Sequence, residues 1–301
     1  MTVDLQQAIN SSLSLRLGSA LAEALPPRFG YRVADWIAEQ IARQKNAELV
    51  QAIGANQWVV SQGALGEEGL DQAVRETLRH SARCIFDLYH YIHAPEAASQ
   101  LIVLDASFQP LVQRPEFDHP GLVIVGLHLS NFDLVLQWLC HRGMRPLVLT
   151  LPDPQGGRRT EYKLRRKSGI NLMPTSVSAI RQALKHLRQG GMVLTGIDRP
   201  IPNPRAYPRF FGRPAALPIH HVFLATKAQV PVIIAATYLQ QDGKYHVFAS
   251  DFIEMDSYPE QETGTLRNAE KVLGVAEQFV RLAPHQWSVP LHVWPESAEL
   301  F

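Results

Sequence analysis

From residue 122 onward, short apolar runs alternate with helical patterns, and this alternation constrains the fold more than any other feature of the chain. Parallel strands need long crossover connections, usually helices, so the alternation predicts an α/β fold with a mainly parallel central sheet flanked by helices. The pair Asp242-Gly243 is a favoured hairpin turn, so residues 245–249 are expected to add an antiparallel edge. The other predicted strands are residues 122–127, 146–151, 171–174, 192–197 and 232–239, and the predicted helices are residues 134–142, 159–167, 178–189 and 266–282.

The first part of the chain has only helical patterns. Apolar residues recur at every fourth position between Leu5 and Leu25, and further helices are predicted at residues 31–44 and 72–93. The stripe from Leu5 to Leu25 can lie on a bilayer or pack against the α/β body. We expect an N-terminal helical region, residues 1–115, and an α/β core, residues 116–301, that form one compact unit.

The composition excludes several classes of protein. Charged residues are 19% and apolar residues 46%, so the chain can form a core and is not disordered. The net charge of +1 provides no global field that would attract nucleic acid. Cys84 and Cys140 lie in apolar helical patterns and are expected to be buried thiols. No apolar run nears the roughly 18 residues of a spanning helix, and no secretory signal is visible, so we expect a soluble protein or one bound at a membrane surface.

The segment His128-Leu-Ser-Asn-Phe-Asp133 joins the first predicted strand of the core to a helix. This context puts an imidazole beside a helix N-terminus, a place suited to chemistry on an acyl or phosphoryl group. Asp133 could turn back and hold the ring in one tautomer, leaving the other nitrogen free to take a proton. The alternative is a capping Asp beside a structural His. His246 and Asp251 have the same spacing but lie in a predicted hairpin strand, so we interpret that copy as chance.

Three further segments are candidates for binding substrate. Six of the ten residues from Arg158 to Lys167 are basic, which suits a phosphate or an anionic headgroup as well as a solvated helix face. Asp198 and Arg199 follow a predicted strand, where open α/β sheets build their sites. Asp198 could orient His128 or a substrate hydroxyl and Arg199 could bind phosphate, or the two could form a surface ion pair. The Pro-rich loop of residues 207–218 could line an acyl groove or dip into an interface, or simply pack its two Phe rings in the core.

Several motifs are missing from the sequence. A Gly-x-Ser-x-Gly elbow is absent, which disfavours a serine hydrolase, and neither a Walker loop nor a dinucleotide-binding fingerprint occurs. The histidines and cysteines lack zinc spacing, so we expect no metal and no cofactor. Aromatic residues do not interleave with the basic cluster, so no nucleic acid partner is expected.

Four motifs occur in an order that resembles the bacterial lipid A biosynthesis (lauroyl/myristoyl) acyltransferase family, also called lysophospholipid acyltransferase-like. They are the His128 segment, residues 164–174, residues 197–199 and residues 210–215. The ending Pro284-His-Gln-Trp287 is also similar to the closing Pro-Glu-Gln-Trp of that family, and the resemblance covers about residues 15–295. The final Asp133 of the first motif is closer to the phosphatidylinositol mannoside acyltransferase branch.

The resemblance implies acyl transfer from a thioester, acyl-CoA or acyl carrier protein, to a hydroxyl of a lipid or glycolipid at the cytoplasmic face of the plasma membrane. It implies that His128 is the general base, that Asp133 and Asp198 are the acids of the site, and that Arg165 belongs to the second motif. Pro200 stands where relatives often have another acid, and the third motif of glycerolipid acyltransferases is absent. The transmembrane anchor of the lipid A enzymes is also missing.

Two other functions remain open on the sequence. One is a non-catalytic lipid-binding protein with an acyltransferase fold, and the other is a general lysophospholipid acyltransferase that differs only in its acceptor. For an acyltransferase, the expected catalytic residues are His128, Asp133 and Asp198. The residues expected to bind substrate are Asn131, Arg165, Arg166, Arg199, Phe210, Phe211 and Arg213.

Overall fold

The computed structural model of the chain describes residues 22–113, 120–150, 162, 165–166 and 169–296. A sheet of seven strands has the order β1-β9-β8-β2-β5-β3-β4, and every neighbouring pair is parallel except β8 with β9. The predicted mainly parallel α/β sheet is therefore confirmed. The strands are β1 (Ile102–Leu104), β2 (Leu122–Gly126), β3 (Leu147–Thr150), β4 (Asn171–Pro174), β5 (Met192–Gly196), β8 (Val232–Leu239) and β9 (Tyr245–Ala249).

The hairpin strand β9 is antiparallel to β8 as predicted, but it is not the edge of the sheet. β1 pairs with its outer side and is the edge strand, in a region where the sequence predicted only helices. The prediction was wrong there because β1 has three residues, too few to display the two-residue period of a strand. It lies between two single-turn helices, α6 (Pro95–Ala98) and α7 (Gln109–Val112).

Helices cover both faces of the sheet. Because successive side chains of a strand point to opposite faces, neighbouring residues of β2 pack against different helices. Leu122 and Ile124 of β2 pack with α8 (Phe132–His141) on one face. Val123 and Val125 pack on the other face, against the helices α10 (Val177–Arg188), α11 (His220–Ala228) and α12 (Gln261–Leu282). Because β2 is central and buried on both faces, it reads in the sequence as a continuous apolar run.

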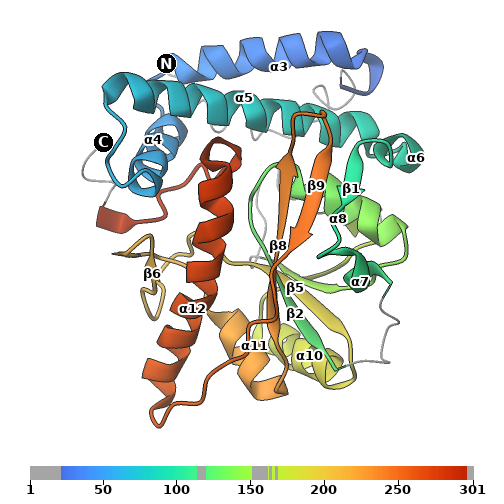
Figure 1. Ribbon diagram of the computed structural model, residues 1–301, viewed down its shortest axis with the longest axis vertical. Coiled ribbons are helices and arrows are strands. Elements are labelled where there is room, and N and C mark those ends of the chain that lie inside the picture. Colours follow the sequence, from blue (N-terminus) through green and yellow to red (C-terminus); the bar gives the residue numbers. More distant parts are fainter. Residues whose placement is uncertain (1–21, 114–119, 151–161, 163–164, 167–168, 297–301) are drawn as a thin grey trace.

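The N-terminal helices lie across one end of the sheet. α3 (Pro27–Ala42) and α5 (Glu67–Tyr91) run side by side along that end, and α4 (Glu48–Val60) lies beneath them (Figure 1). The sequence did not reveal α4, because most of its residues are buried and no single apolar stripe results. The predicted stripe from Leu5 to Leu25 lies almost wholly outside the described residues, as does most of the predicted helix at 159–167.

Candidate active site

The ends of two adjacent parallel strands bring together the two central residues of the site. In the register of β2 and β5, Gly126 is paired with Gly196. His128 and Asp198 each lie two residues beyond these glycines, so the strand pairing alone puts them side by side at the carboxyl edge of the sheet. This is the position that the sequence predicted for both residues.

Asp198 holds His128 through both of its carboxylate oxygens. The His128 Nδ1 is 2.7 Å from Asp198 Oδ1, and the His128 backbone N–H donates to Oδ2 at 2.7 Å. The indole Nε1–H of Trp287 also donates to Oδ2, at 2.8 Å. Because an ionised carboxylate can only accept, this network assigns the ring proton to Nδ1 and leaves Nε2 as the nitrogen that can take a proton.

The side chains of Asp198 and His128 differ in burial. The Asp198 side chain is fully buried, whereas that of His128 is 24% exposed. Burial by itself would raise the pKa of Asp198, but the charge and hydrogen bonds of His128, with the Trp287 indole, hold that pKa below its ordinary value. The carboxylate therefore stays ionised near neutral pH behind an imidazole that solvent can reach.

Asp133 does not contact the imidazole, contrary to the prediction that it could turn back onto His128. It pairs instead with Arg165, whose Nε lies 2.9 Å from Oδ1 and 3.1 Å from Oδ2. The ring of Phe132 is the one that meets His128, edge-on with centroids 4.9 Å apart. Successive helical residues diverge by about 100°, so a helix that points residue 132 at the imidazole points residue 133 elsewhere.

The loop between His128 and α8 is held by the segment that follows α12. The backbone N–H of Ser130, which has a φ of 48°, donates to the Gln286 carbonyl at 2.9 Å. The N–H of Ser288 donates to the His128 carbonyl at 3.0 Å, and the Gln286 side chain is tied to the backbone of Leu239. The short helix η1 (Pro284–Gln286) therefore ties the loop to β8, and Trp287 beside it reaches Asp198.

Asn131 is occupied within the protein, although it was predicted to bind substrate. Its Oδ1 accepts from the backbone N–H of Leu134 at 3.4 Å, which caps α8, and its Nδ2 donates to the Cys84 carbonyl at 3.0 Å. His80 of α5 also supports the loop, with Nε2 3.1 Å from Ser130 Oγ. The sequence carried no signal for His80, which is one polar residue on an ordinary amphipathic helix.

Phe210 and Phe211 are both buried in the core, which is one of the three possibilities that the sequence allowed for this loop. Phe210 is fully buried, stacks on Trp294 at 5.6 Å and meets Trp287 edge-on at 6.0 Å. Phe210 therefore packs against Trp287, and its own ring is buried and does not face a groove. Phe211, buried beside it, also lines a cavity.

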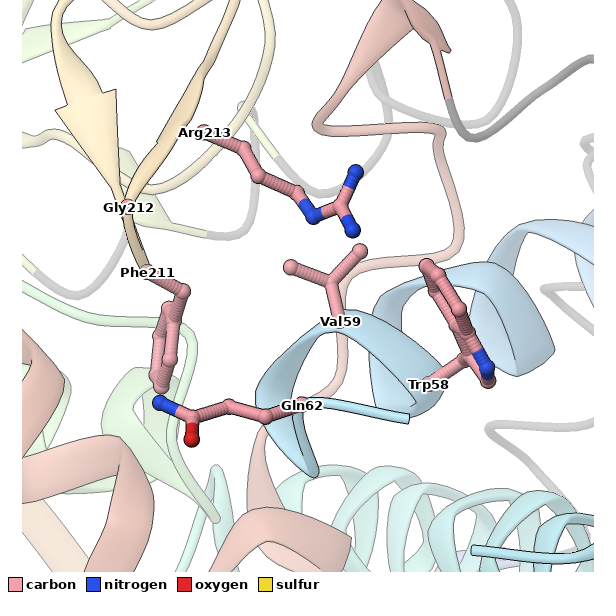
Figure 2. A pocket seen from close by; sticks show the side chains of 6 residues that line it. All are labelled: Trp58, Val59, Gln62, Phe211, Gly212 and Arg213. Carbon is pink, nitrogen blue, oxygen red and sulfur yellow. The ribbon is translucent and has the colours of Figure 1, made fainter. Parts of the chain in front are cut away.

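That cavity has a volume of about 390 Å³ and lies between α4 and the hairpin of β6 (Arg209–Phe210) and β7 (Arg213–Pro214). Figure 2 shows the Arg213 side chain extending from the hairpin toward Trp58 on α4, and its guanidinium carbon lies 5.1 Å from the Trp58 ring centroid. Arg213 makes no hydrogen bond or ion pair with His128 or Asp198, so its expected role at the site stays a prediction. The cavity is lined by Trp58, Val59, Gln62, Phe211, Gly212 and Arg213.

The remaining predicted cations, Arg166 and Arg199, each follow a predicted site residue directly in the chain. Arg199 follows Asp198 directly and is half-buried. Arg166 is exposed, and its guanidinium carbon lies 5.0 Å from the Tyr162 ring centroid. Among the described residues no group of three or more His, Cys, Asp or Glu side chains could hold a metal ion. None of the helices in the described part of the chain combines the length and apolar character that crossing a bilayer requires.

The geometry places an imidazole supported by a buried carboxylate just before the N-terminus of α8. A comparison with curated proteins finds no match. A family model described as bacterial lipid A biosynthesis acyltransferase matches residues 71–294, well over half of the chain, including His128, Asp198 and Trp287. The chain therefore belongs to the bacterial lipid A biosynthesis acyltransferase family, as its ordered motifs predict.

Proposed function

We propose that this protein moves a fatty acyl group from a thioester to a hydroxyl of a membrane lipid or glycolipid, with His128 as the general base. Membership of the family establishes acyltransferase chemistry in lipid biosynthesis. The observation that carries the finer proposal is the pairing of a partly exposed imidazole with a buried carboxylate, 2.7 Å from Nδ1 to Oδ1. Such a pair leaves one basic nitrogen directed away from the carboxylate, which is what removal of a proton from an alcohol requires.

The proposed reaction has two steps. The acceptor hydroxyl gives its proton to His128 Nε2 as its oxygen bonds to the thioester carbonyl carbon, forming a tetrahedral oxyanion. The carbon–sulfur bond then breaks, the carbonyl reforms, and His128 returns the proton to the departing thiolate. Asp198 stabilises the imidazolium between these steps. The backbone N–H groups of Phe132 and Asp133, in the first turn of α8, are the proposed donors to the oxyanion.

The acyl donor and the lipid acceptor are proposed from the family and from the first motif. Acyl-CoA or acyl carrier protein is the proposed donor, and no other cofactor enters the reaction. A mannoside-type glycolipid at the cytoplasmic face of the plasma membrane is the proposed acceptor, because Asp133 closes the first motif as in that branch. Arg165, held by Asp133, and the exposed Arg166 are proposed to meet the phosphate of one substrate.

The test is release of free thiol from an acyl thioester in the presence of bacterial lipid extract. We expect His128→Ala to lower the rate by about 10² or more, the usual scale for general-base catalysis. His246→Ala is the matched control, because His246 has the same spacing to an acid but bonds Asp242 at 2.9 Å in the hairpin. Near-normal turnover in His128→Ala would defeat the assignment. No thiol release by the native protein would favour the non-catalytic lipid-binding alternative.

The acceptor is identified by lipid mass spectrometry of a strain that lacks the protein. Loss of one acyl chain from a mannoside glycolipid is the expected result. Loss of a diacyl phospholipid with accumulation of its lyso form would instead identify a general lysophospholipid acyltransferase.

A further inference from the structure

The inward face of α3 consists of small residues that fit closely against α5. Gly30, Ala34, Ala38 and Ala42 are all buried. A Cβ at Gly30 would overlap the Phe86 ring of α5, so the two helices approach as closely as a glycine permits. This contact fixes the rotation of α3 about its axis and determines which side chains face outward.

The outward face of α3 is apolar. Phe29 is 58% exposed and Trp36 is 64% exposed, and Val33 and Ile37 beside them are also exposed. Val33 lies four residues after Phe29, and Trp36 and Ile37 lie three and four residues after Val33, so the side chains form one stripe along the helix. Soluble monomers seldom leave a contiguous stripe of large apolar side chains in water unless another surface covers it.

The charges of α3 are divided between its two sides. Asp35 is bonded to Arg83 of α5 through both oxygens, at 2.6 and 2.7 Å, and Glu39 is paired with Arg75. The acids of α3 are thus neutralised on the side of α5. Arg28 and Arg32 are exposed beside the apolar stripe, and the guanidinium carbon of Arg32 lies 5.9 Å from the Phe29 ring centroid. An apolar stripe bordered by arginines complements an anionic lipid surface.

This face lies at the end of the molecule that holds the site. α5 contacts α3 on one side through Arg83, and it contacts the His128 loop on the other, where His80 approaches Ser130 at 3.1 Å. In Figure 1, α3 and α5 cross the same end of the sheet. α5 therefore lies between α3 and the His128 loop, with the apolar stripe of α3 on the side away from α5.

We infer that the outward face of α3, defined by Phe29, Val33, Trp36 and Ile37 with Arg28 and Arg32, docks the protein on an anionic bilayer surface. The helix lies in the plane of the interface, its apolar stripe among the acyl chains and its arginines at the phosphates. The inference rests on the proposed function for its purpose, which is to hold the site near its lipid acceptor. Binding of the protein to a bilayer can be measured by vesicle flotation, which does not depend on catalytic turnover.

The experiment is flotation of the full-length protein with vesicles of phosphatidylcholine, with and without phosphatidylglycerol. We expect Phe29→Ser with Trp36→Ser to lower the partition coefficient on anionic vesicles about tenfold or more, since two large side chains lose their apolar burial. Phe252→Ser with Leu282→Ser is the matched control, because these residues are 62% and 75% exposed elsewhere on the molecule. Arg28→Glu with Arg32→Glu should abolish the preference for anionic vesicles, as should high salt.

A fluorescent label on Val33→Cys reports whether a bilayer, another segment of the chain or a second copy lies over this face. Cys84 and Cys140 are buried, so they do not compete for the label. A blue shift that requires vesicles supports the inference. A probe already shielded without vesicles would show that another segment or a second copy covers the face, and the inference would fail. It would also fail if the α3 and control pairs floated equally.

The two proposals fail in different ways. If the site assignment is wrong, His128→Ala releases thiol as the native protein does while the α3 variants still lose flotation. If docking is wrong, flotation is unchanged in the α3 variants. With both proposals correct, the α3 variants keep the rate of thiol release toward a detergent-solubilised acceptor and lose it only toward acceptor held in vesicles.

Discussion

At the scale of single residues, two carboxylates near the site, Asp198 and Asp133, have different partners. Asp198 faces the imidazole and Asp133 faces Arg165. We expect Asp198→Asn to lower kcat/KM by about 10² to 10⁴, because an amide nitrogen beside Nδ1 would favour the wrong tautomer and offer no charge to the imidazolium. Asp133→Asn should cost less and act mainly through KM. Steady-state kinetics of thiol release measures both, and a larger loss of kcat in Asp133→Asn would contradict the geometry.

The residues of the site were predictable where chain order fixes their position. His128 follows a strand and precedes a helix, and Asp198 follows another strand, so their location at the carboxyl edge came from the sequence. Their pairing was only one of several possibilities on the sequence, because it depends on β2 and β5 being neighbours in register, which no local pattern specifies. Trp287 was visible in the closing motif, but its hydrogen bond to Asp198 joins residues distant in the chain.

At the scale of elements, the proposed oxyanion donors belong to the first turn of α8, so the proposed chemistry depends on how that turn is held. Asn131→Ala removes both the cap and the bond to the Cys84 carbonyl, and should lower the free energy of unfolding by about 1–2 kcal/mol. Ser176→Ala removes the cap of α10, a bond of 3.1 Å to Ala179, away from the His128 loop. Urea unfolding should show a loss in both variants. Thiol release should fall only in Asn131→Ala, and an equal fall in Ser176→Ala would mean that the effect is general instability.

The helices and strands could be predicted where their apolar residues recur with a helical or strand period. The long amphipathic helices and the buried strands matched their predicted positions to within a few residues. Among the elements that were not predicted, α4 and β1 share a cause: one is buried nearly all round and the other is three residues long, so neither displays a stripe or an alternation.

At the scale of the whole molecule, buried histidines make stability depend on pH. His80 and His221 lie in the interior, and burial lowers the pKa of His80 to about 4 and that of His221 to about 3. Neither ring nitrogen of His221 has a hydrogen-bond partner among the described residues, so protonation there gains no compensating contact.

The lowered pKa values of His80 and His221 make the protein less stable as the pH falls. An ordinary histidine in the unfolded chain has a pKa of about 6.5, so below that pH the unfolded state binds more protons than the folded state. Stability contributed by the neutral rings is complete above about pH 6.5 and is lost as the pH falls toward 4 and 3, by about 1.4 kcal/mol per pH unit for each ring. His221→Leu should therefore make the free energy of unfolding less steep in pH between about 6 and 4. Urea titrations across that range measure the slope, with His93→Leu at an exposed site as the control. An unchanged slope in His221→Leu would mean that His221 is not held neutral in the folded protein.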